Sequence, residues 1–229
     1  MSERPTVRAR PVAIEAGWID LYRRLRPALL GHVIEDGFVD EKIRTITPDV
    51  QVVGTAITVR LPDGDLEALV PAVDLLEPGD VLVIDHGGRE SLACWGELTS
   101  LAARGRGCAG VIVDGAVANI LELQGHGLPT FARGVAALGG RRLGRGGGVN
   151  VPAQCGGVAV HPGDLVVADD DGIVIVPPAN LADVASAAEA ALTRMPLARA
   201  WVQHGGPMGE ITGLEAAEIQ ALLQARGWT

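Results

Sequence analysis

Aromatic residues are scarce in this chain, since Phe, Trp and Tyr together make up only 3% of its 229 residues. Proteins that bind single-stranded nucleic acid without sequence preference stack the bases on aromatic side chains. The scarcity therefore argues against that kind of recognition. Glycine is abundant instead, with 31 residues, and hydrophobic residues reach 48%. These values favour a tightly packed globular body of small side chains, of the α/β or β-rich class.

The sequence also lacks a basic excess, an apolar leader and a long apolar run. Its formal charge of −9 at pH 7 opposes binding to a phosphate backbone. The arginines that lie on glycine-rich, loop-like sequence form no dense basic face; they are Arg104, Arg106, Arg141, Arg142 and Arg145. No run approaches the ~20 apolar residues that a bilayer-spanning helix needs, and the N-terminus has no apolar signal core. We expect a cytoplasmic protein that binds neither nucleic acid nor a membrane.

Cysteine is rare, and its spacing is uninformative. Cys94, Cys108 and Cys155 are odd in number and show no Cys-x-x-Cys spacing, which disfavours both a disulfide framework and a zinc site. Buried free thiols are the simplest interpretation. Cys94 adjoins a predicted pocket, so a nucleophilic role is the alternative, although no nearby histidine motif supports it.

The most informative stretch of the chain runs over residues 95–119. Gly96 lets the backbone approach a ligand, and the N–H groups of Gly96 to Thr99, at the start of a predicted helix, form an anion site suited to a carboxylate. Residues 111–113 are β-branched and bounded by glycines, so they predict a buried strand that delivers Asp114 to its carboxyl end. Ligands of open α/β sheets collect at that end. We therefore predict a substrate pocket that includes Gly96, Glu97, Leu98 and Thr99.

A second buried strand, predicted over residues 81–85, leads into a glycine-rich loop. His86 and Arg89 of that loop would lie at the carboxyl end of the strand, which makes them pocket candidates; a solvated turn is the alternative. A third strand is predicted over residues 50–61, with Gly54 as a bulge or a point of close approach. The candidate catalytic residues are thus Glu97, Asp114, Arg89 and His86.

The rest of the chain supplies helices, a hairpin region and flexible segments. Helical patterns cover residues 17–30, 66–76, 179–193 and 213–224. Residues 158–176 alternate short strands and turns, as in a β-meander. Residues 1–10 are polar and predict a loose arm or a segment that docks on a neighbour. Residues 139–148 contain glycines and arginines and predict a mobile surface loop, with anion binding as the alternative.

Several motifs in this order resemble the RraA-like family. They are Gly96-Glu-Leu98, Gly110-Val-Ile-Val-Asp-Gly-Ala-Val117, Leu128-Pro-Thr-Phe-Ala-Arg-Gly134, Asn150-Val-Pro152, Gly156-Gly-Val158, His161-Pro-Gly-Asp164 and Ala168-Asp-Asp-Asp-Gly-Ile173. The resemblance covers roughly residues 30 to 190. The family includes the regulator of ribonuclease E activity and the 4-hydroxy-4-methyl-2-oxoglutarate/4-carboxy-4-hydroxy-2-oxoadipate aldolases.

The resemblance implies a single-domain α/β protein with a layered β/β/α swivelling-domain fold and C-terminal helices. It also implies a ring-shaped homotrimer or a hexamer, with sites between adjacent subunits. We accordingly divide the chain into an N-terminal arm and helix (residues 1–29), a core (residues 30–190) and a helical tail (residues 191–229). The tail would pack on a neighbouring subunit, where Glu210 or Glu215 could reach a site.

The aldolases of this family cleave a 4-hydroxy-2-oxo acid with a divalent metal, usually magnesium, and also decarboxylate oxaloacetate. After their central strand they read Asp-Gly-x-Val-Arg-Asp, in which the arginine holds the 2-oxo acid and the last aspartate ligates the metal. This chain has Ala118 and Asn119 at those positions. An amide in place of the carboxylate removes a full charge and weakens Mg²⁺ binding. The missing arginine removes a bidentate clamp on a carboxylate.

Three functions are compatible with this altered pattern. The first is a divergent lyase of aldolase or decarboxylase type that acts on a small 2-oxo or β-keto carboxylic acid through an enolate. Mg²⁺ or Mn²⁺ would then be held by Asn119, waters and Glu97, with His86 or Arg89 replacing the lost cation. The second is an enzyme of altered, metal-independent chemistry in the same pocket. The third is a non-catalytic regulatory or binding protein, like the ribonuclease E regulator.

Overall fold

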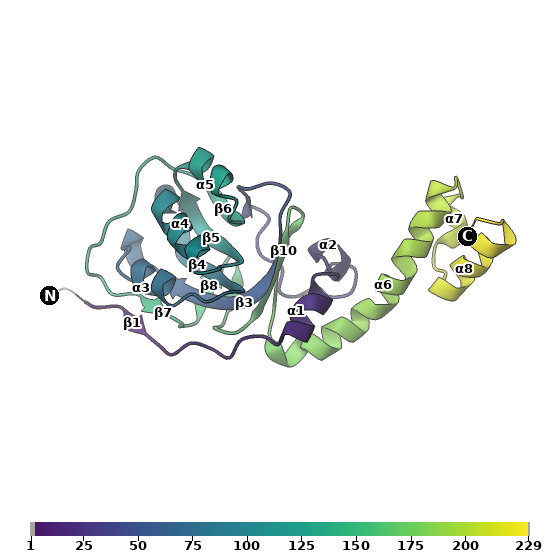
Figure 1. The fold of residues 1–229 in the computed structure, drawn as a ribbon, viewed down its shortest axis with the longest axis horizontal. Helices are drawn as coiled ribbons and strands as arrows, with labels where there is room; N and C mark the ends of the chain where they lie inside the picture. Colours follow the sequence, from purple (N-terminus) through teal and green to yellow (C-terminus); the bar gives the residue numbers. More distant parts are fainter. Residues whose placement is uncertain (1–2, 229) are drawn as a thin grey trace.

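The computed structural model describes residues 3–228, except for the side chain of Asp63. At its centre, four parallel strands lie side by side: β3 (Gln51–Arg60), β4 (Asp80–Trp95), β5 (Gly110–Val117) and β6 (Thr130–Val135). The helices α3 (Leu69–Asp74), α4 (Glu97–Gly105) and α5 (Ile120–His126) connect them in turn. All three helices pack into the same hydrophobic cluster, so they cover one face of the sheet (Figure 1).

Shorter strands complete the sheet around this centre. Its order is β1-β7-β3-β4-β5-β6-β2, with β1 at Thr6–Val7, β7 at Gly148–Val149 and β2 at Arg44–Thr45. The antiparallel pair β10 (Leu165–Asp169) and β11 (Gly172–Val176) joins the first half of β3. A separate hairpin, β8 (Ala153–Cys155) with β9 (Val158–Val160), packs on the face opposite the helices.

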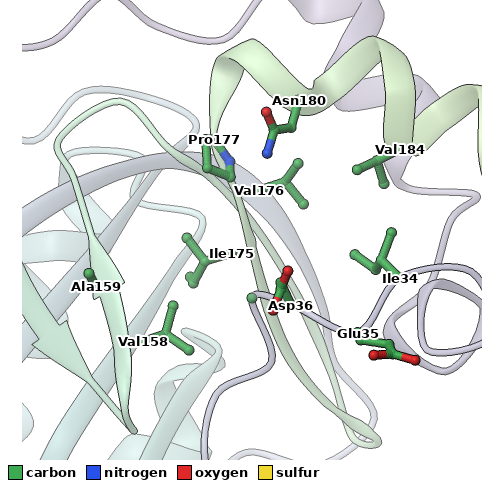
Figure 2. A pocket seen from close by; sticks show the side chains of 11 residues that line it. Ile34, Glu35, Asp36, Val158, Ala159, Ile175, Val176, Pro177, Asn180 and Val184 are labelled. Carbon is green, nitrogen blue, oxygen red and sulfur yellow. The ribbon is translucent and has the colours of Figure 1, made fainter.

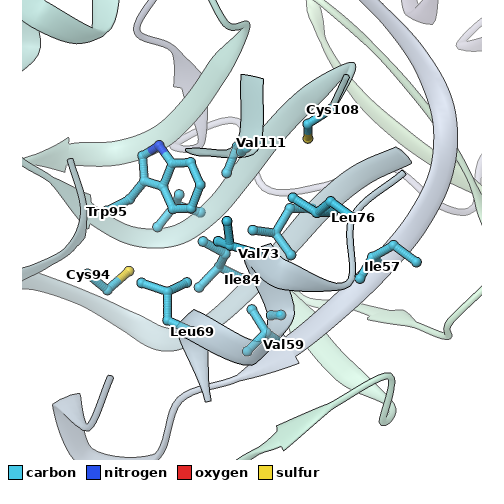
Figure 3. Close-up of a cluster of buried hydrophobic side chains, with 14 of the residues drawn as sticks. Ile57, Val59, Leu69, Val73, Leu76, Ile84, Cys94, Trp95, Cys108 and Val111 are labelled. Atoms are coloured by element: carbon cyan, nitrogen blue, oxygen red, sulfur yellow. The ribbon is translucent and has the colours of Figure 1, made fainter. Parts of the chain in front are cut away.

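The alternation of side chains along the strands divides the core into two layers. Leu82 and Ile84 of β4 point to the helices and pack with Trp95, as Figure 3 shows for this cluster. Val81 and Val83 point to the other face and pack against the β8–β9 hairpin. Because both faces are covered, the parallel strands are continuous apolar runs. This is the arrangement that the short β-branched runs of the sequence predicted.

The remaining helices form a third cluster and an arm. α1 (Ala16–Tyr22), α2 (Pro27–Leu30) and the first part of α6 (Leu181–Gln203) pack on β10 and β11. α6 then runs away from the core, and α7 (Met208–Ile211) and α8 (Ala216–Ala225) fold back on its far end (Figure 1). Trp201, fully buried, anchors that far cluster. Two 3₁₀ turns, Pro62–Gly64 and Pro178–Asn180, complete the elements.

Several boundaries differ from the expectation. The predicted strand over 81–85 continues to Trp95 as part of β4. After Asp85 the strand bulges, but Arg89, Ala93 and Trp95 still pair with β5. The helical stretch over 17–30 is divided, since Pro27 begins a second helix. The meander over 158–176 is correct only for β10 and β11, because β9 pairs with β8 instead.

The N-terminal segment lies on the protein's own core. Arg10 donates to Asp80 Oδ2 (2.6 Å) and to the Leu75 carbonyl (2.8 Å), and the Ile14 N–H donates to Thr55 Oγ1 (2.9 Å). The prediction of a loose arm over residues 1–10 is therefore wrong for residues 3–10, while residues 1 and 2 lie outside the described part. Within that part, none of the helices combines the length and the apolar character needed to cross a bilayer.

The loop predicted to be mobile is anchored to the core. The buried carboxylate of Asp65 accepts hydrogen bonds from the N–H groups of Leu143 (2.8 Å) and Arg145. Arg142 forms an exposed ion pair with Glu67 (2.6 Å). The arginines of residues 139–148 thus sit on a loop whose backbone is held by one buried aspartate.

Gly54 of β3 occupies a point of close approach, as one of the two sequence interpretations stated. A Cβ atom at this position would lie 2.3 Å from the Gly79 carbonyl oxygen and 2.8 Å from Val81 Cγ2. The neighbouring backbone therefore leaves no room for a side chain.

We predict that Gly54→Ala lowers the free energy of unfolding by ~1–3 kcal/mol, as expected when a methyl group is forced into a packed site. Gly134→Ala is the matched control, because Gly134 also lies in a strand and a Cβ there meets nothing within 4 Å. Urea unfolding of both variants measures the difference. Equal stability of the two variants would contradict the close approach.

Candidate functional site

Two turns meet at the carboxyl ends of β4 and β5. The Ala118 N–H donates to the Trp95 carbonyl (2.8 Å). A Cβ on Gly96 would lie 2.9 Å from Asn119 Oδ1, so the Asn119 side chain in this position packs directly against the backbone of Gly96. Asn119 itself adopts the left-handed conformation (φ 57°), which asparagine tolerates better than most residues. The structure thus brings together the predicted residues Gly96, Ala118 and Asn119.

The first turn of α4 opens onto this edge. The Gly96 N–H donates to Thr99 Oγ1 (3.1 Å), and the Thr99 hydroxyl donates to the Gly96 carbonyl (2.9 Å). The Gly96 N–H is therefore occupied, unlike in the predicted anion site. The N–H groups of Glu97, Leu98 and Thr99 remain as first-turn donors with no acceptor inside the helix. These three groups, together with the positive end of the helix dipole, suit an anion.

Glu97 lies beside a histidine that the sequence reasoning did not select. His126 ends α5, and its Nε2 atom is 3.9 Å from Glu97 Oε1. The two helices follow consecutive parallel strands and pack on the same face. Two consecutive right-handed βαβ units place α4 and α5 next to each other on the sheet. The alternation of strands and helices is the only feature of the sequence that points to this contact. The last residue of one helix and the first of the other are not otherwise related in the sequence.

Asp114 belongs to a buried ion-pair network. Arg133 Nε donates to Asp114 Oδ1, and the Gly156 N–H donates to Asp114 Oδ2 (2.8 Å). Arg133 also reaches Asp40 Oδ2 through Nη1 (2.7 Å). Burial lowers the pKa of Arg133, but its hydrogen bonds to the two aspartates outweigh burial and raise that pKa above its ordinary value. Because both of its oxygens are engaged, Asp114 holds the scaffold together, and we do not place it among the reacting groups.

His86 and Arg89 lie on the bulged part of β4. Between Asp85 and Trp95 this strand uses ten residues while β5 advances only three, so the excess protrudes as bulges. His86 is 2% exposed and its Nδ1 would be 2.8 Å from a Cβ on Gly115. Burial lowers its pKa from the ordinary value, which favours the neutral ring. Arg89 is exposed, and its backbone pairs with Gly115 of β5. Gly115 precedes Ala118 by three residues, so the Arg89 backbone lies ~10 Å along the strand from Ala118.

The cysteines are packing groups. Cys94, Cys108 and Cys155 are free and buried. Burial raises the pKa of the Cys94 thiol to about 12, so almost none of it is thiolate at neutral pH. Cys94 is therefore a buried free thiol, as the simplest interpretation of the sequence stated, and the nucleophilic alternative is not supported.

The donors at this edge do not suit a divalent metal. Asn119 offers a neutral amide oxygen next to Gly96, and Glu97, the acid that follows Gly96, lies beside His126. Residues 3–228 contain no group of three or more His, Cys, Asp or Glu side chains that could hold a metal ion. Mg²⁺ and Mn²⁺ favour charged oxygen ligands, so one chain supplies a poor set.

Cavities lie on other parts of the chain. One of about 460 Å³ is lined mainly by apolar side chains of β9, β11 and α6, with Glu35 and Asp36 nearby (Figure 2). Another, of about 410 Å³, lies between α2 and α6. Neither includes Gly96, Glu97, Ala118 or Asn119. Glu210 and Glu215, the tail residues considered for a site, lie on the distal arm, where Glu210 pairs with Arg226 (3.0 Å).

Comparisons with known proteins identify relatives of this chain. The model of the RraA-like family (Aldolase/RraA) matches residues 28–175. A Halalkalibacterium halodurans protein named "Putative 4-hydroxy-4-methyl-2-oxoglutarate aldolase" is 39% identical over 135 residues, which are 59% of this chain and 64% of that protein. The match therefore spans less than two thirds of that relative's length.

Solved structures extend the likeness over most of the chain. An uncharacterized protein from Pseudomonas syringae pv. tomato str. DC3000 has a TM-score of 0.75 and 25% identity, with 89% of this chain and 96% of that chain covered. Streptomyces coelicolor RraAS2, described as an unusual member of the RNase ES inhibitor RraA protein family, has a TM-score of 0.68 and 26% identity, covering 76% and 92%. The fold class predicted from the sequence is confirmed.

We predict that Arg133→Met lowers the free energy of unfolding by ~3–5 kcal/mol, because it leaves the buried Asp114 carboxylate without its cation. Arg142→Met is the matched control, since Arg142 is 64% exposed in its pair with Glu67. That exposed pair should contribute ~0–1 kcal/mol. Chemical denaturation measures the free energy of unfolding of both variants. Equally small decreases in that free energy would refute the scaffold role of the Asp114 network.

Proposed function

Because the chain belongs to the RraA-like family, we propose that it is a divergent carbon–carbon lyase acting on a small 2-oxo or β-keto carboxylic acid through an enolate. The single observation that carries this proposal is the close pairing of the Gly96 and Asn119 turns beside the first turn of α4. The Halalkalibacterium relative, which is named as an aldolase of 4-hydroxy-4-methyl-2-oxoglutarate, supports an aldolase-type substrate class. Aldol cleavage and β-decarboxylation share the enolate, so one site serves both.

The substrate carboxylate would bind the N–H groups of Glu97, Leu98 and Thr99. Fixed backbone donors at a helix N-terminus need no reorganisation when an anion binds. The amide of Asn119 lies next to this turn and can donate a hydrogen bond to the oxygen that becomes negative in the enolate. In the decarboxylation, the bond to the leaving carboxylate breaks, its electron pair forms the enolate, and CO₂ departs. A proton from the site then completes the product ketone.

This assignment requires no metal at Asn119. A neutral amide donor stabilises an enolate oxygen less than a metal cation does, and a single oxyanion donor is typically worth ~2.7–4 kcal/mol of transition-state stabilisation. We therefore propose slow turnover that does not depend on Mg²⁺ or Mn²⁺.

A regulatory role is the second candidate. It is favoured by the neutral residues Ala118 and Asn119, which stand where the aldolase pattern has charges, and by the likeness to RraAS2, which is described as an unusual member of the RNase ES inhibitor RraA protein family. A binding protein of this kind would have no turnover. The likeness to RraAS2 is one of fold and of 26% sequence identity. RNase ES is therefore named as a target for the family of RraAS2 and not for this chain.

We further propose that a second copy of the chain covers the edge that carries the site, in a homotrimer or hexamer. Four large apolar side chains are exposed near this edge: Leu98 (79%) and Leu121 (76%) in the first turns of α4 and α5, Val135 (51%) at the end of β6, and Leu138 (62%) in the loop that follows. Clusters of exposed apolar side chains mark interaction surfaces. The arm formed by the end of α6, α7 and α8 offers a further contact to a neighbour.

Sedimentation equilibrium should give a mass of three or six 23.7 kDa chains for the wild type and a lower mass for the Leu98→Glu/Leu121→Glu double variant. Val12→Glu is the control, because Val12 is 90% exposed on the N-terminal segment, and it should leave the mass unchanged. A monomeric wild type would refute the covered edge.

Pyruvate release from oxaloacetate and from 4-hydroxy-4-methyl-2-oxoglutarate tests the activity, with blank rates subtracted. We expect turnover by the wild type that persists in chelator. The Ala118→Arg/Asn119→Asp double variant, which restores both charges, should gain ~10-fold or more with Mg²⁺ if the scaffold is aldolase-like. Turnover by the double variant but not by the wild type would reject the lyase proposal and favour the regulatory one.

A further inference from the structure

The replaced charges leave the site without an obvious proton carrier, and the contact between Glu97 and His126 supplies one. We propose that His126 is a positioning residue that holds and relays a proton through Glu97, which is the acid–base group of the site. This inference rests on the proposed lyase function. Its evidence is the placement of Glu97, which belongs to the Gly96-Glu-Leu98 motif, beside His126, which lies outside the motifs of the family resemblance.

α5 presents His126 to α4. The helix starts at Asn119, and its buried residue Leu123 fixes its inner face in the core. His126 follows three residues later, which places it on the same face, and helical side chains tilt toward the N-terminal end. The Nε2 atom of the ring thereby comes to 3.9 Å from Glu97 Oε1, in the first turn of α4.

The imidazole lies beside the Glu97 carboxylate. Its Nε2 atom has no accessible surface and no hydrogen-bond partner among the described residues, and it lies 3.9 Å from Glu97 Oε1. That separation is longer than a hydrogen bond, but the Glu97 side chain is 41% exposed and has room to rotate. Catalytic hydrogen bonds are often long in the absence of substrate and shorten when it binds. Because Nε2 is covered, His126 itself cannot touch the substrate, so its effect must pass through Glu97.

The relay balances protons in both reactions. In aldol cleavage, the Glu97 carboxylate takes the proton of the 4-hydroxyl group, and the carbon–carbon bond breaks with its electron pair forming the enolate. The same proton, shared with His126 in the meantime, returns to the enolate carbon. In β-decarboxylation, CO₂ leaves without a proton, so one proton must come from solvent: it enters at the Glu97 carboxylate, whose side chain is 41% exposed, is shared with His126 Nε2, and passes from Glu97 to the enolate carbon.

The test uses the full-length chain with oxaloacetate as the substrate. Acid–base groups typically contribute ~10²–10⁴-fold, so His126→Gln and Glu97→Gln should each lower kcat by ~100-fold while KM changes by less than about threefold. The double variant should lose no more than the single ones. His32→Gln, at an exposed histidine away from this edge, is the matched control and should keep the wild-type kcat.

Chemical rescue separates a relay from a packing role. Added imidazole should restore a large part of kcat to His126→Ala but none to Glu97→Gln, because only the first variant leaves a space for it beside an intact Glu97. A His126→Gln variant with kcat within about threefold of the wild type, or a His126→Ala variant that imidazole does not rescue, overturns the proposal. An inactive wild type instead rejects the lyase function, and the relay with it, so the two failures are distinguishable.

Discussion

The buried ion pair between Asp114 and Arg133 is the interaction on which the rest of this structure depends. It joins β5 to β6, and through Asp40 and the Gly156 N–H it also fixes the segment before β2 and the turn between β8 and β9. Arg133 is only 10% exposed, so removal of either partner would strand a charge in the core. This network therefore holds the carboxyl half of β5, which leads directly into Ala118 and Asn119.

On that fixed edge the chain has the neutral side chains of Ala118 and Asn119. The turn geometry is kept, as the contact of Gly96 with Asn119 and the hydrogen bond from Ala118 to Trp95 indicate. A cation at 118 and a carboxylate at 119 are absent, while Glu97 and His126 form a pair on the helical side. A site with backbone donors, an amide and an acid–base pair can bind a small carboxylate and move protons without a metal at its centre.

The sequence predicted the strands and the two turns well, because buried parallel strands are short β-branched runs and glycines mark close approach. Gly54 illustrates this, since the backbone of Gly79 excludes a Cβ there, and Gly96 lies where the Asn119 side chain packs against the neighbouring turn. The bulges of β4 were not predictable, because they depend on how many residues β5 offers for pairing. The same limit hid the binding of Arg10 to Asp80 and the contact of His126 with Glu97, since both join segments that no local pattern relates.

Oxalate is a planar dicarboxylate that resembles the enolate of pyruvate, and its binding tests the central claim directly. Isothermal titration calorimetry would measure the dissociation constant for the wild type in chelator and again in Mg²⁺. The account predicts binding in chelator with a constant that Mg²⁺ changes by less than about twofold, because backbone N–H groups and Asn119 hold the ligand. Binding that appears only when Mg²⁺ is present would contradict it.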